Sequence, residues 1–237
     1  MTSILGTNIF LEKGLSQLTT LVVSPHPDDE VLGVGGTLLR RKAEGASIGW
    51  LIMTNISTES GWSPKAVLRR KDEIARITEL FGFDSVFELE YPTTRLDQIP
   101  MSELVSAVST VLKKYSPHEI FIPHSSDIHS DHRITFDVVA SCTKWFRSPS
   151  IKRILAYETL SETEFGLDPN KRFQPNVYVN IEGFLESKLQ AMNVYSSEIQ
   201  SFPFPRSNEA ISALAVLRGS NSGFKQAEAF ELLRELN

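Results

Sequence analysis

Hydrophobic and polar positions along the chain alternate between two spacings, one typical of strands and one typical of helices. Residues 19–24 form a short run rich in apolar and β-branched side chains, which predicts a buried strand. Residues 31–42 carry apolar side chains at helical spacing and predict a helix. Such alternation with short connections predicts an α/β fold, in which a mainly parallel sheet carries helices on both faces. The other predicted strands of this series are 47–53, 85–89, 119–122 and 151–157, and the other helices are 64–81, 101–115 and 131–146.

The last third of the chain is less regular. Residues 176–180 are predicted to add a strand, and the apolar spacing that follows predicts helices at 181–195, 208–217 and 224–236. No internal repeat, low-complexity stretch or Pro/Ser-rich linker divides the sequence. We therefore expect one domain over residues 1–237 with a small C-terminal extension.

Composition and charge narrow the class of protein. Of 237 residues, 41% are hydrophobic and 22% are charged, which is ordinary for a globular chain. The net charge is −5 and the basic residues are scattered, so a nucleic-acid partner is not expected. No apolar run approaches the roughly 20 residues of a membrane span, and residues 1–21 do not resemble a secretion signal. We expect a cytoplasmic protein whose single cysteine, Cys142, packs on a helix face.

Two clusters of polar side chains follow predicted strands. Residues 24–30 read Ser-Pro-His-Pro-Asp-Asp-Glu directly after the first strand, and residues 129–132 read His-Ser-Asp-His shortly after the fourth. In open parallel sheets, functional residues collect at the carboxyl ends of the strands. We therefore expect the two clusters to lie close together in the folded chain.

The two clusters together contain the ligands of a catalytic zinc site. A tight turn can direct both His26 and Asp29 at one ion, and His132 can supply the third ligand from the second cluster. Two imidazoles and one carboxylate with an open fourth position are typical of catalytic zinc. One Zn²⁺ per chain would lower the pKa of a bound water and polarise a substrate carbonyl.

The remaining polar residues of the clusters have predicted roles in hydrolysis. Asp28 can accept the proton of the attacking water as general base and return it to the leaving amine. His129, when protonated, can stabilise an oxyanion, and Asp131 can orient it. Asp127 can support the same shell of ligands. These residues predict a metal-dependent hydrolase.

Simpler explanations exist for each cluster alone. The acidic residues 28–30 can cap a helix and favour its first turn, and two histidines three residues apart are common on exposed loops. The joint pattern favours the metal site, because four of the five histidines lie at or near the two strand ends. The four histidines are His26, His124, His129 and His132, of which His124 is expected only to close its strand.

A metal-dependent phosphoesterase is a less favoured alternative, because such an enzyme usually needs more carboxylates and often two ions.

These motifs resemble those of the PIG-L/LmbE-like deacetylase family. The hallmark His-Pro-Asp-Asp-Glu stands at 26–30 with a Gly-rich segment at 33–36, and the later His-x-Asp-His stands at 129–132. The matching positions extend over nearly the whole chain in the order typical of the family. They also include Pro123 and Asp127 before the second motif, Arg70 and Glu73 before a helix ending at Phe81-Gly82, and the terminal segment 223–230.

The resemblance implies a Rossmann-like fold and a zinc-dependent deacetylase acting on N-acetylglucosamine-type conjugates. It also implies that His26, Asp29 and His132 bind the metal, that Asp28 is the general base, and that His129 is the electrophilic histidine with Asp131 behind it. Arg70 matches a residue that contacts the sugar or its attached group in some members, although on a helix it can equally be a surface residue. Relatives often form rings or dimers, so a homo-oligomer is one expected state.

Two departures leave the substrate open. Asp127 stands where some members have a tyrosine that helps to hold the oxyanion. The loop 91–95 has Thr93 and Thr94 where some relatives present an acidic residue to sugar hydroxyls, with Asp97 as a possible substitute. An amidase that cleaves a larger thiol or sugar conjugate is therefore an alternative, as is a carbohydrate-binding protein without turnover.

Two aromatic segments have open roles. Trp62 precedes a predicted helix, on a loop that either faces the site or is anchored by a half-buried indole. Residues 202–205 read Phe-Pro-Phe-Pro and either cover the pocket or pack elsewhere, and we favour packing.

Overall fold

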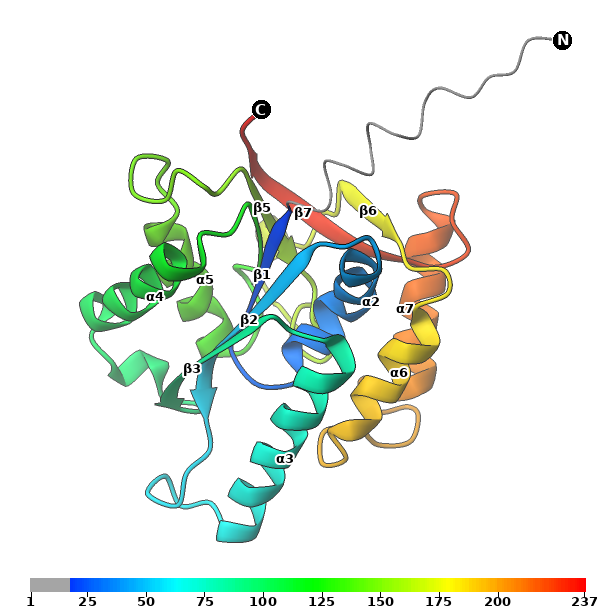
Figure 1. The fold of residues 1–237 in the computed structure, drawn as a ribbon. Helices are drawn as coiled ribbons and strands as arrows, with labels where there is room; N and C mark the ends of the chain where they lie inside the picture. The colour runs from blue at the N-terminus through cyan, green and yellow to red at the C-terminus, as the bar shows by residue number, and fades with distance from the viewer. Residues whose placement is uncertain (1–17) are drawn as a thin grey trace, which may run out of the picture.

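One seven-stranded sheet organises the part of the chain that the structure describes, residues 18–237 of a computed structural model (Figure 1). The strand order is β3-β2-β1-β4-β5-β7-β6, and the first five strands are parallel. β7 runs antiparallel to β5, and β6 runs antiparallel to β7. The strands are β1 (Thr19–Ser24), β2 (Ser47–Asn55), β3 (Ser85–Pro92), β4 (Glu119–Pro123), β5 (Arg153–Tyr157), β6 (Val177–Asn180) and β7 (Ala227–Glu235).

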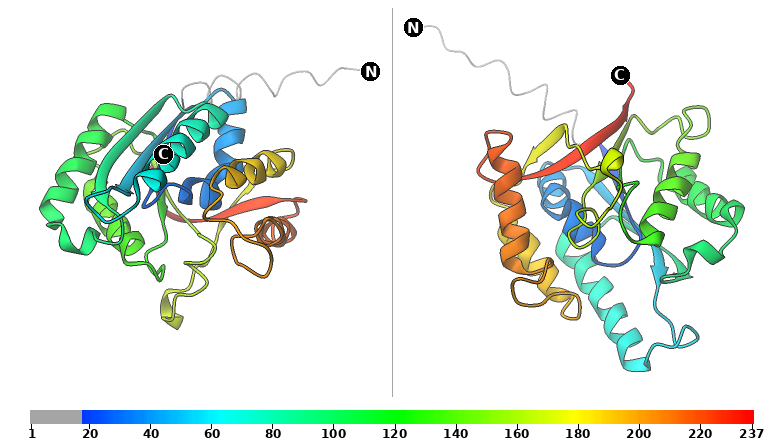
Figure 2. Two further views of the ribbon diagram at one scale, coloured as in Figure 1. Left: turned by 90° about the horizontal axis from the view of Figure 1, so that it is seen from below. Right: turned by 180° about the vertical axis from the view of Figure 1, so that it is seen from behind.

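Helices cover both faces of the sheet, as the sequence predicts. Figure 2 shows α4 and α5 on one face and α2, α3, α6 and α7 on the other. This arrangement confirms the predicted α/β fold with a mainly parallel sheet. The helices are α2 (Asp29–Ala43), α3 (Pro64–Phe81), α4 (Met101–Tyr115), α5 (Ser130–Cys142), α6 (Leu185–Val194) and α7 (Asn208–Ser220), with short 3-10 turns at η1 (Leu96–Gln98) and η2 (Pro169–Lys171).

The alternation of side chains along β1 divides the core into two layers. Val22 faces the layer formed with α2, α3, α6 and α7, where Trp50 and Phe121 are also buried. Leu21 and Val23 face the layer formed with α4 and α5. A strand that is apolar on both faces is expected where helices pack against both sides of a parallel sheet.

The ends of α3 follow the predicted signals. The Ser63 side chain accepts a hydrogen bond from the backbone N–H of Ala66, Pro64 occupies the first turn, and Gly82 ends the helix with a φ of 65°. In α2, Gly33 permits the expected close approach to the sheet, because an added Cβ would lie 2.2 Å from the ring of Tyr157 on β5.

The predicted helix at 224–236 is wrong, because residues 227–235 form strand β7. Alanine, glutamate and leucine favour helices when only local preference acts. Here β7 pairs on both sides, with Phe230 opposite Tyr157 of β5 and Val177 of β6. The predicted C-terminal extension is thus part of the same sheet, and the predicted strand at 176–180 is confirmed as β6. Residues 1–17 of the predicted domain lie outside the described residues.

The sheet places the two polar clusters at one crevice. β1 and β4 are hydrogen-bonded neighbours, and Val22 lies opposite Phe121 in their register. The connection from β1 leads to β2 on one side, whereas β4 continues to β5 on the other. Ligands of open α/β folds bind at such a reversal, beyond the carboxyl ends of the strands.

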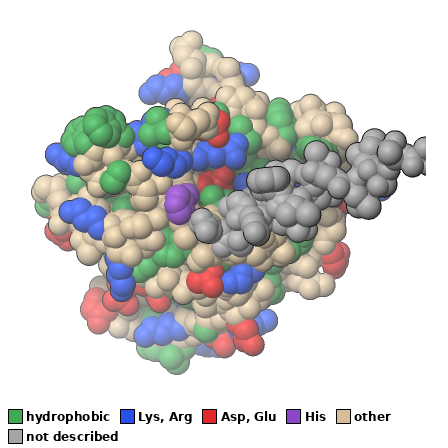
Figure 3. Space-filling model, turned by 45° about the horizontal axis from the view of Figure 1, so that its top comes forward, with side chains coloured by type: hydrophobic (Ala, Val, Ile, Leu, Met, Phe, Trp, Pro, Cys, Tyr) green, Lys and Arg blue, Asp and Glu red, His purple; other side chains and the backbone are tan. Residues whose placement is uncertain are grey.

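The surface gives two further observations. On the face shown in Figure 3, basic and acidic side chains are interspersed, in keeping with the scattered charges of the sequence. Within residues 18–237, no helix is long and apolar enough to cross a membrane.

Candidate functional site

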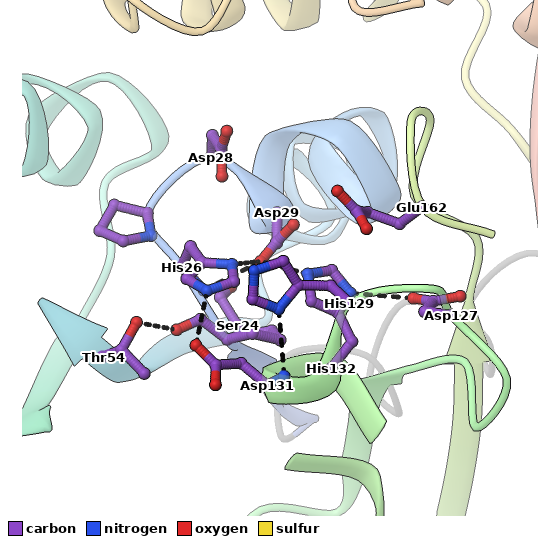
Figure 4. A network of polar contacts seen from close by, with 12 residues as sticks. Ser24, His26, Asp28, Asp29, Thr54, Asp127, His129, Asp131, His132 and Glu162 are labelled. Carbon is purple, nitrogen blue, oxygen red and sulfur yellow. Dashed lines mark hydrogen bonds and ion pairs between the residues drawn. The ribbon is translucent and has the colours of Figure 1, made fainter. Parts of the chain in front are cut away.

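The acidic turn after β1 and the start of α5 meet as expected, although they are a hundred residues apart in sequence (Figure 4). His26, Asp29 and His132 each offer one ligand atom, and these atoms all lie within 4.8 Å of one another. Asp29 begins α2, and His132 lies in the first turn of α5, so both helix starts point into the crevice. The three residues predicted to bind a metal therefore form one group.

Two of the three spacings among these atoms match those of ligands around a tetrahedral zinc ion. The Asp29 Oδ2 atom lies 3.4 Å from His26 Nδ1 and 3.3 Å from His132 Nε2. Ligands at about 2.0–2.1 Å from a tetrahedral ion are roughly 3.3 Å apart, longer than ordinary hydrogen bonds. The donor set and its spacing thus suit Zn²⁺.

Two further carboxylates orient the imidazoles of His26 and His132. His26 Nε2 lies 3.0 Å from Asp131 Oδ2, and His132 Nδ1 lies 2.9 Å from Asp127 Oδ2. Carboxylates in this position fix the orientation of ligand imidazoles and make them stronger ligands. Asp127 thus supports the shell as expected.

The expected partnership of Asp131 with His129 differs in the structure. The Asp131 carboxylate contacts His26 and accepts hydrogen bonds from the backbone N–H groups of Thr94 and Leu96. Asp131 donates a hydrogen bond to His129 Nδ1 from its backbone N–H, at the beginning of α5. Asp131 therefore positions a candidate metal ligand and the 94–96 loop.

Without a metal, the carboxylates hold protons on the ligand imidazoles. Burial alone would lower the pKa of His26, but hydrogen bonds to Asp131 and Asp29 outweigh it and raise the pKa to about 9. Burial also opposes the charged form of His132, yet the charge of Asp29 and the bond to Asp127 raise its pKa well above the usual value. The site thus attracts positive charge, and a divalent cation would bind with release of these protons.

Asp28 lies beside this group in an unusual backbone conformation. Its φ is 133°, which disfavours any residue other than glycine. Its N–H donates to the Glu30 carboxylate at 3.0 Å, and Glu30 in turn accepts a 2.6 Å hydrogen bond from the Tyr195 hydroxyl. Arg206 pairs with the Asp28 carboxylate at 2.9 Å. The buried residue Glu30 therefore supports the backbone of Asp28 and Arg206 holds its side chain.

The charge state of Asp28 suits proton transfer near neutrality. Burial first, and then the neighbouring charge of Asp29, raise the pKa of Asp28 to about 7, while Arg206 opposes this rise. A general base is most effective when its pKa is close to the working pH.

His129 differs from the expectation of a protonated imidazole. Burial first, and then the charges of His26 and His132, lower its pKa to about 4, so the ring is neutral at pH 7. Its Nδ1 accepts from the Asp131 N–H at 3.1 Å, which leaves the proton on Nε2. A neutral imidazole can still donate one hydrogen bond to a developing oxyanion.

A pocket of about 210 Å³ opens over the candidate ligands. Arg70, Trp62, Thr93 and Thr94 line it as the sequence suggested, whereas Asp97 does not. Besides these residues and the polar cluster residues already described, its walls include Asn55, Thr159, Ser161, Glu162, Glu198 and Arg206.

Arg70 reaches the pocket, but protein groups engage its guanidinium. It donates to the Pro27 carbonyl at 2.6 Å and to Glu198 at 2.7 Å, and its Nε lies 3.2 Å from Glu73. These contacts tie α3 to the turn that carries Asp28. Arg70 thus supports that turn, while direct contact with a substrate stays a prediction.

Sequence reasoning missed three charged residues of the pocket. Glu162 comes from the turn after β5, and Glu198 and Arg206 come from the loop between α6 and α7. Arg206 closely follows the segment 202–205, for which we favoured packing away from the pocket. No spacing signal marks these residues, because isolated charges in loops are common.

Comparison with known proteins agrees with this architecture. A diacetylchitobiose deacetylase of Thermococcus kodakarensis is 25% identical over 228 residues, which cover 90% of this chain and 82% of that protein. The crystal structure of the conserved protein TT1542 from Thermus thermophilus is 29% identical and has a TM-score of 0.74, covering 93% of this chain and 97% of that one.

Two more distant solved structures share the fold. The N,N'-diacetylchitobiose deacetylase of Pyrococcus horikoshii has a TM-score of 0.72 at 22% identity and covers 99% of this chain and 95% of its own. The 4-carboxy-2-hydroxymuconate hydratase of Pseudomonas putida has a TM-score of 0.70 at 16% identity and covers 93% and 98%. Since both a deacetylase and a hydratase have this fold, the fold alone does not select the reaction.

The fold and the convergent His-Asp-His group define an α/β protein with a mainly parallel sheet and a candidate metal site. The PIG-L family, described as GlcNAc-PI de-N-acetylase, matches residues 21–143 of the 237. The chain belongs to this family of deacetylases.

Proposed function

We propose that the protein is a zinc-dependent hydrolase that removes the acetyl group from an N-acetylamino-sugar conjugate of the N-acetylglucosamine type. The observation that carries the proposal is the group of His26, Asp29 and His132, with Asp29 at zinc-ligand spacing from both imidazoles, beside a buried carboxylate on Asp28. Family membership and the diacetylchitobiose deacetylase relative support the acetyl group as the acyl part.

His26, Asp29 and His132 would hold one zinc ion per chain, with the carboxylates of Asp131 and Asp127 fixing the two imidazoles. When bound, zinc supplies Lewis acidity that polarises the amide carbonyl and makes water nucleophilic at neutral pH. The pocket walls orient the sugar above this group.

Asp28 is the proposed general base. It takes a proton from the water that attacks the amide carbon, and it gives that proton to the nitrogen as the C–N bond breaks, which yields acetate and a free amine. Its bond to Arg206 and the support of its backbone by Glu30 keep the carboxylate beside the candidate ligands during both transfers.

His129 is the proposed hydrogen-bond donor to the carbonyl oxygen. Its Nδ1 is occupied by the Asp131 N–H, so its Nε2–H is free to donate as negative charge develops on that oxygen. This donor partly replaces the tyrosine that some relatives have at the position of Asp127. A cytoplasmic location and a homo-oligomeric state stay predictions.

Acetate release tests the proposal. The protein is treated with a chelator, reloaded with Zn²⁺, and incubated with a panel of N-acetylglucosamine conjugates. We expect release only from the reloaded protein. Asp28→Asn should lower turnover by about 100- to 10,000-fold while zinc content, measured by metal analysis, stays at that of the wild type.

The identity of the released acid separates the alternatives. A longer acid in place of acetate would indicate an amidase acting on a larger conjugate. Binding of the conjugates without release of any acid would indicate a carbohydrate-binding protein. Unchanged turnover in Asp28→Asn would remove Asp28 from the role of base.

A further inference from the structure

The turn after β5 brings a further carboxylate to the pocket, beside Asp28, Asp29 and Glu198. Glu162 lines the same cavity as Asp28 and the candidate ligands. Figure 4 shows its carboxylate directed toward the side of Asp29 and His132. Glu162 therefore reaches the site from a segment outside the two motifs at 26–30 and 129–132.

Hydrogen bonds fix this turn to the loop before α5. The Thr163 hydroxyl donates to Asp127 Oδ1 at 2.7 Å and accepts from the Thr159 N–H at 2.8 Å. The Ile128 N–H donates to the Glu162 carbonyl at 3.2 Å. Because Asp127 also holds His132, the backbone of Glu162 has a fixed position relative to a candidate metal ligand.

The backbone before Glu162 is strained. Ser161 has a φ of 79°, a conformation that non-glycine residues seldom adopt. The Glu164 carboxylate stabilises it by accepting the Ser161 N–H at 2.6 Å. Such strained positions occur often at binding and catalytic sites, where they direct a side chain.

Glu162 differs from the other pocket carboxylates in its lack of an ion-pair partner. Asp28 pairs with Arg206, Asp29 lies between two imidazoles, and Glu198 pairs with two arginines. Within the described residues 18–237, Glu162 has no ion pair, and the Ser161 hydroxyl lies 3.4 Å from it. A partly buried carboxylate without an ion-pair partner is stabilised by a hydrogen-bond donor, which a ligand can supply.

We infer that Glu162 is a specificity-determining residue that accepts a hydrogen bond from the substrate hydroxyl next to the acetamido-bearing carbon. This inference rests on the proposed function. With the acetamido group over the candidate ligands, the sugar hydroxyl at C3 lies in the same part of the pocket, whereas C1 carries the attached group of a conjugate. The loop 91–95, expected to contact hydroxyls, offers the pocket only the neutral Thr93 and Thr94.

Paired substrates and one substitution test this contact. Glu162→Gln is compared with the wild type on an N-acetylglucosamine conjugate and on its 3-deoxy analogue. For the hydroxylated substrate, kcat/KM should fall by about 5- to 15-fold, because the hydroxyl then donates to a neutral amide oxygen in place of a charged carboxylate. For the 3-deoxy analogue it should change less than about threefold. Zinc content should be unchanged.

Glu164→Gln is the matched control. It makes the same change two residues away, but Glu164 lines the neighbouring cavity and its amide oxygen can still accept the Ser161 N–H. Glu164→Gln should leave the ratio of the two substrates at the wild-type value. An equal loss on both substrates in Glu162→Gln, or no loss on either, would overturn the inference.

A binding measurement keeps this test separate from the proposed function. N-acetylglucosamine, its 3-deoxy analogue and glucosamine are titrated calorimetrically into metal-free wild type and Glu162→Gln. The wild type should prefer the hydroxylated sugar, and the variant should show a clearly smaller preference, even if no acetate is released. Equal affinity of the wild type for both sugars would overturn the contact. Preference for glucosamine over both, lost in Glu162→Gln, would assign Glu162 to the product ammonium instead.

Discussion

The two halves of the chain contribute differently to one pocket. Residues before β5 supply the candidate ligands His26, Asp29 and His132 together with Asp28. Residues after β5 supply Glu162, Glu198 and Arg206, which line the same cavity. The first set lies in short motifs at strand ends, while the second depends on contacts between distant segments. The proposed reaction chemistry thus comes from the first half, and the shape and charge of the pocket come partly from the second.

The largest expected effect comes from the first half. His132→Ala removes one of three ligands, so zinc content should fall far below one per chain and acetate release should be lost almost completely. Metal analysis and the acetate assay measure both. His118→Ala is the control, because His118 is exposed and bonded to Thr19 away from the site. A His132→Ala protein that keeps zinc and turnover would break the comparison.

The next largest effect is on stability, and it concerns how α6 and β7 of the second half support α2 of the first. Lys188 of α6 pairs with Glu228 of β7 at 2.6 Å, and Glu228 accepts the backbone N–H groups of Gly36 and Thr37 in α2. Both side chains are only 5% exposed. Lys188→Met should lower the free energy of unfolding by about 3–5 kcal/mol, because it leaves Glu228 buried and unpaired.

Denaturant unfolding measures this loss. Lys225→Met is the matched control, since Lys225 also pairs with a glutamate, Glu182 at 2.8 Å, but is 81% exposed. Its effect should be below about 1 kcal/mol. Equal stability of the two variants would show that the ion pair between β7 and α6 does not support α2.

The smallest expected effect concerns the contact between the two halves at Asp28, where Arg206 of the second half pairs with Asp28 of the first. Arg206→Gln removes the cation that opposes the raised pKa of Asp28, so this pKa should rise further above about 7. Because Asp28 must be deprotonated to act as base, the acidic limb of the kcat/KM profile should move to higher pH. At pH 7 activity should fall by about 10-fold for each unit of that movement.

A pH–rate profile of kcat/KM checks this shift. Arg218→Gln serves as control, because Arg218 pairs with Glu158 and does not line the main pocket. Movement of the limb to lower pH, or equal movement in both variants, would contradict the assigned role of Arg206.

The candidate ligands could be predicted because their residue types and positions follow directly from the order of the chain. A histidine and two carboxylates after a buried strand, and a second histidine after the neighbouring strand, must meet if the sheet is parallel. Asp131 shows the limit of this reasoning. Its partner is His26, 105 residues away, because the backbone at the start of α5 occupies His129.

The last strand, β7, and the long-range contacts of the C-terminal segments could not be predicted from local preference. Residues 227–235 have helix-favouring side chains, but partners on both sides make them a strand. Arg206 meets Asp28 across 178 residues, and Tyr195 meets Glu30 across 165. Such contacts leave no periodic signal in the sequence.

The position of β7 has a consequence for the order of events during synthesis. This strand is inserted between β5 and β6, and its Glu228 holds the helix whose first residues include Asp29. A nascent chain that has already emerged as far as α7 contains every ligand residue, yet β5 still lacks one neighbour and α2 lacks its buried anchor. Assembly of a firm candidate site is therefore delayed until β7 has left the ribosome.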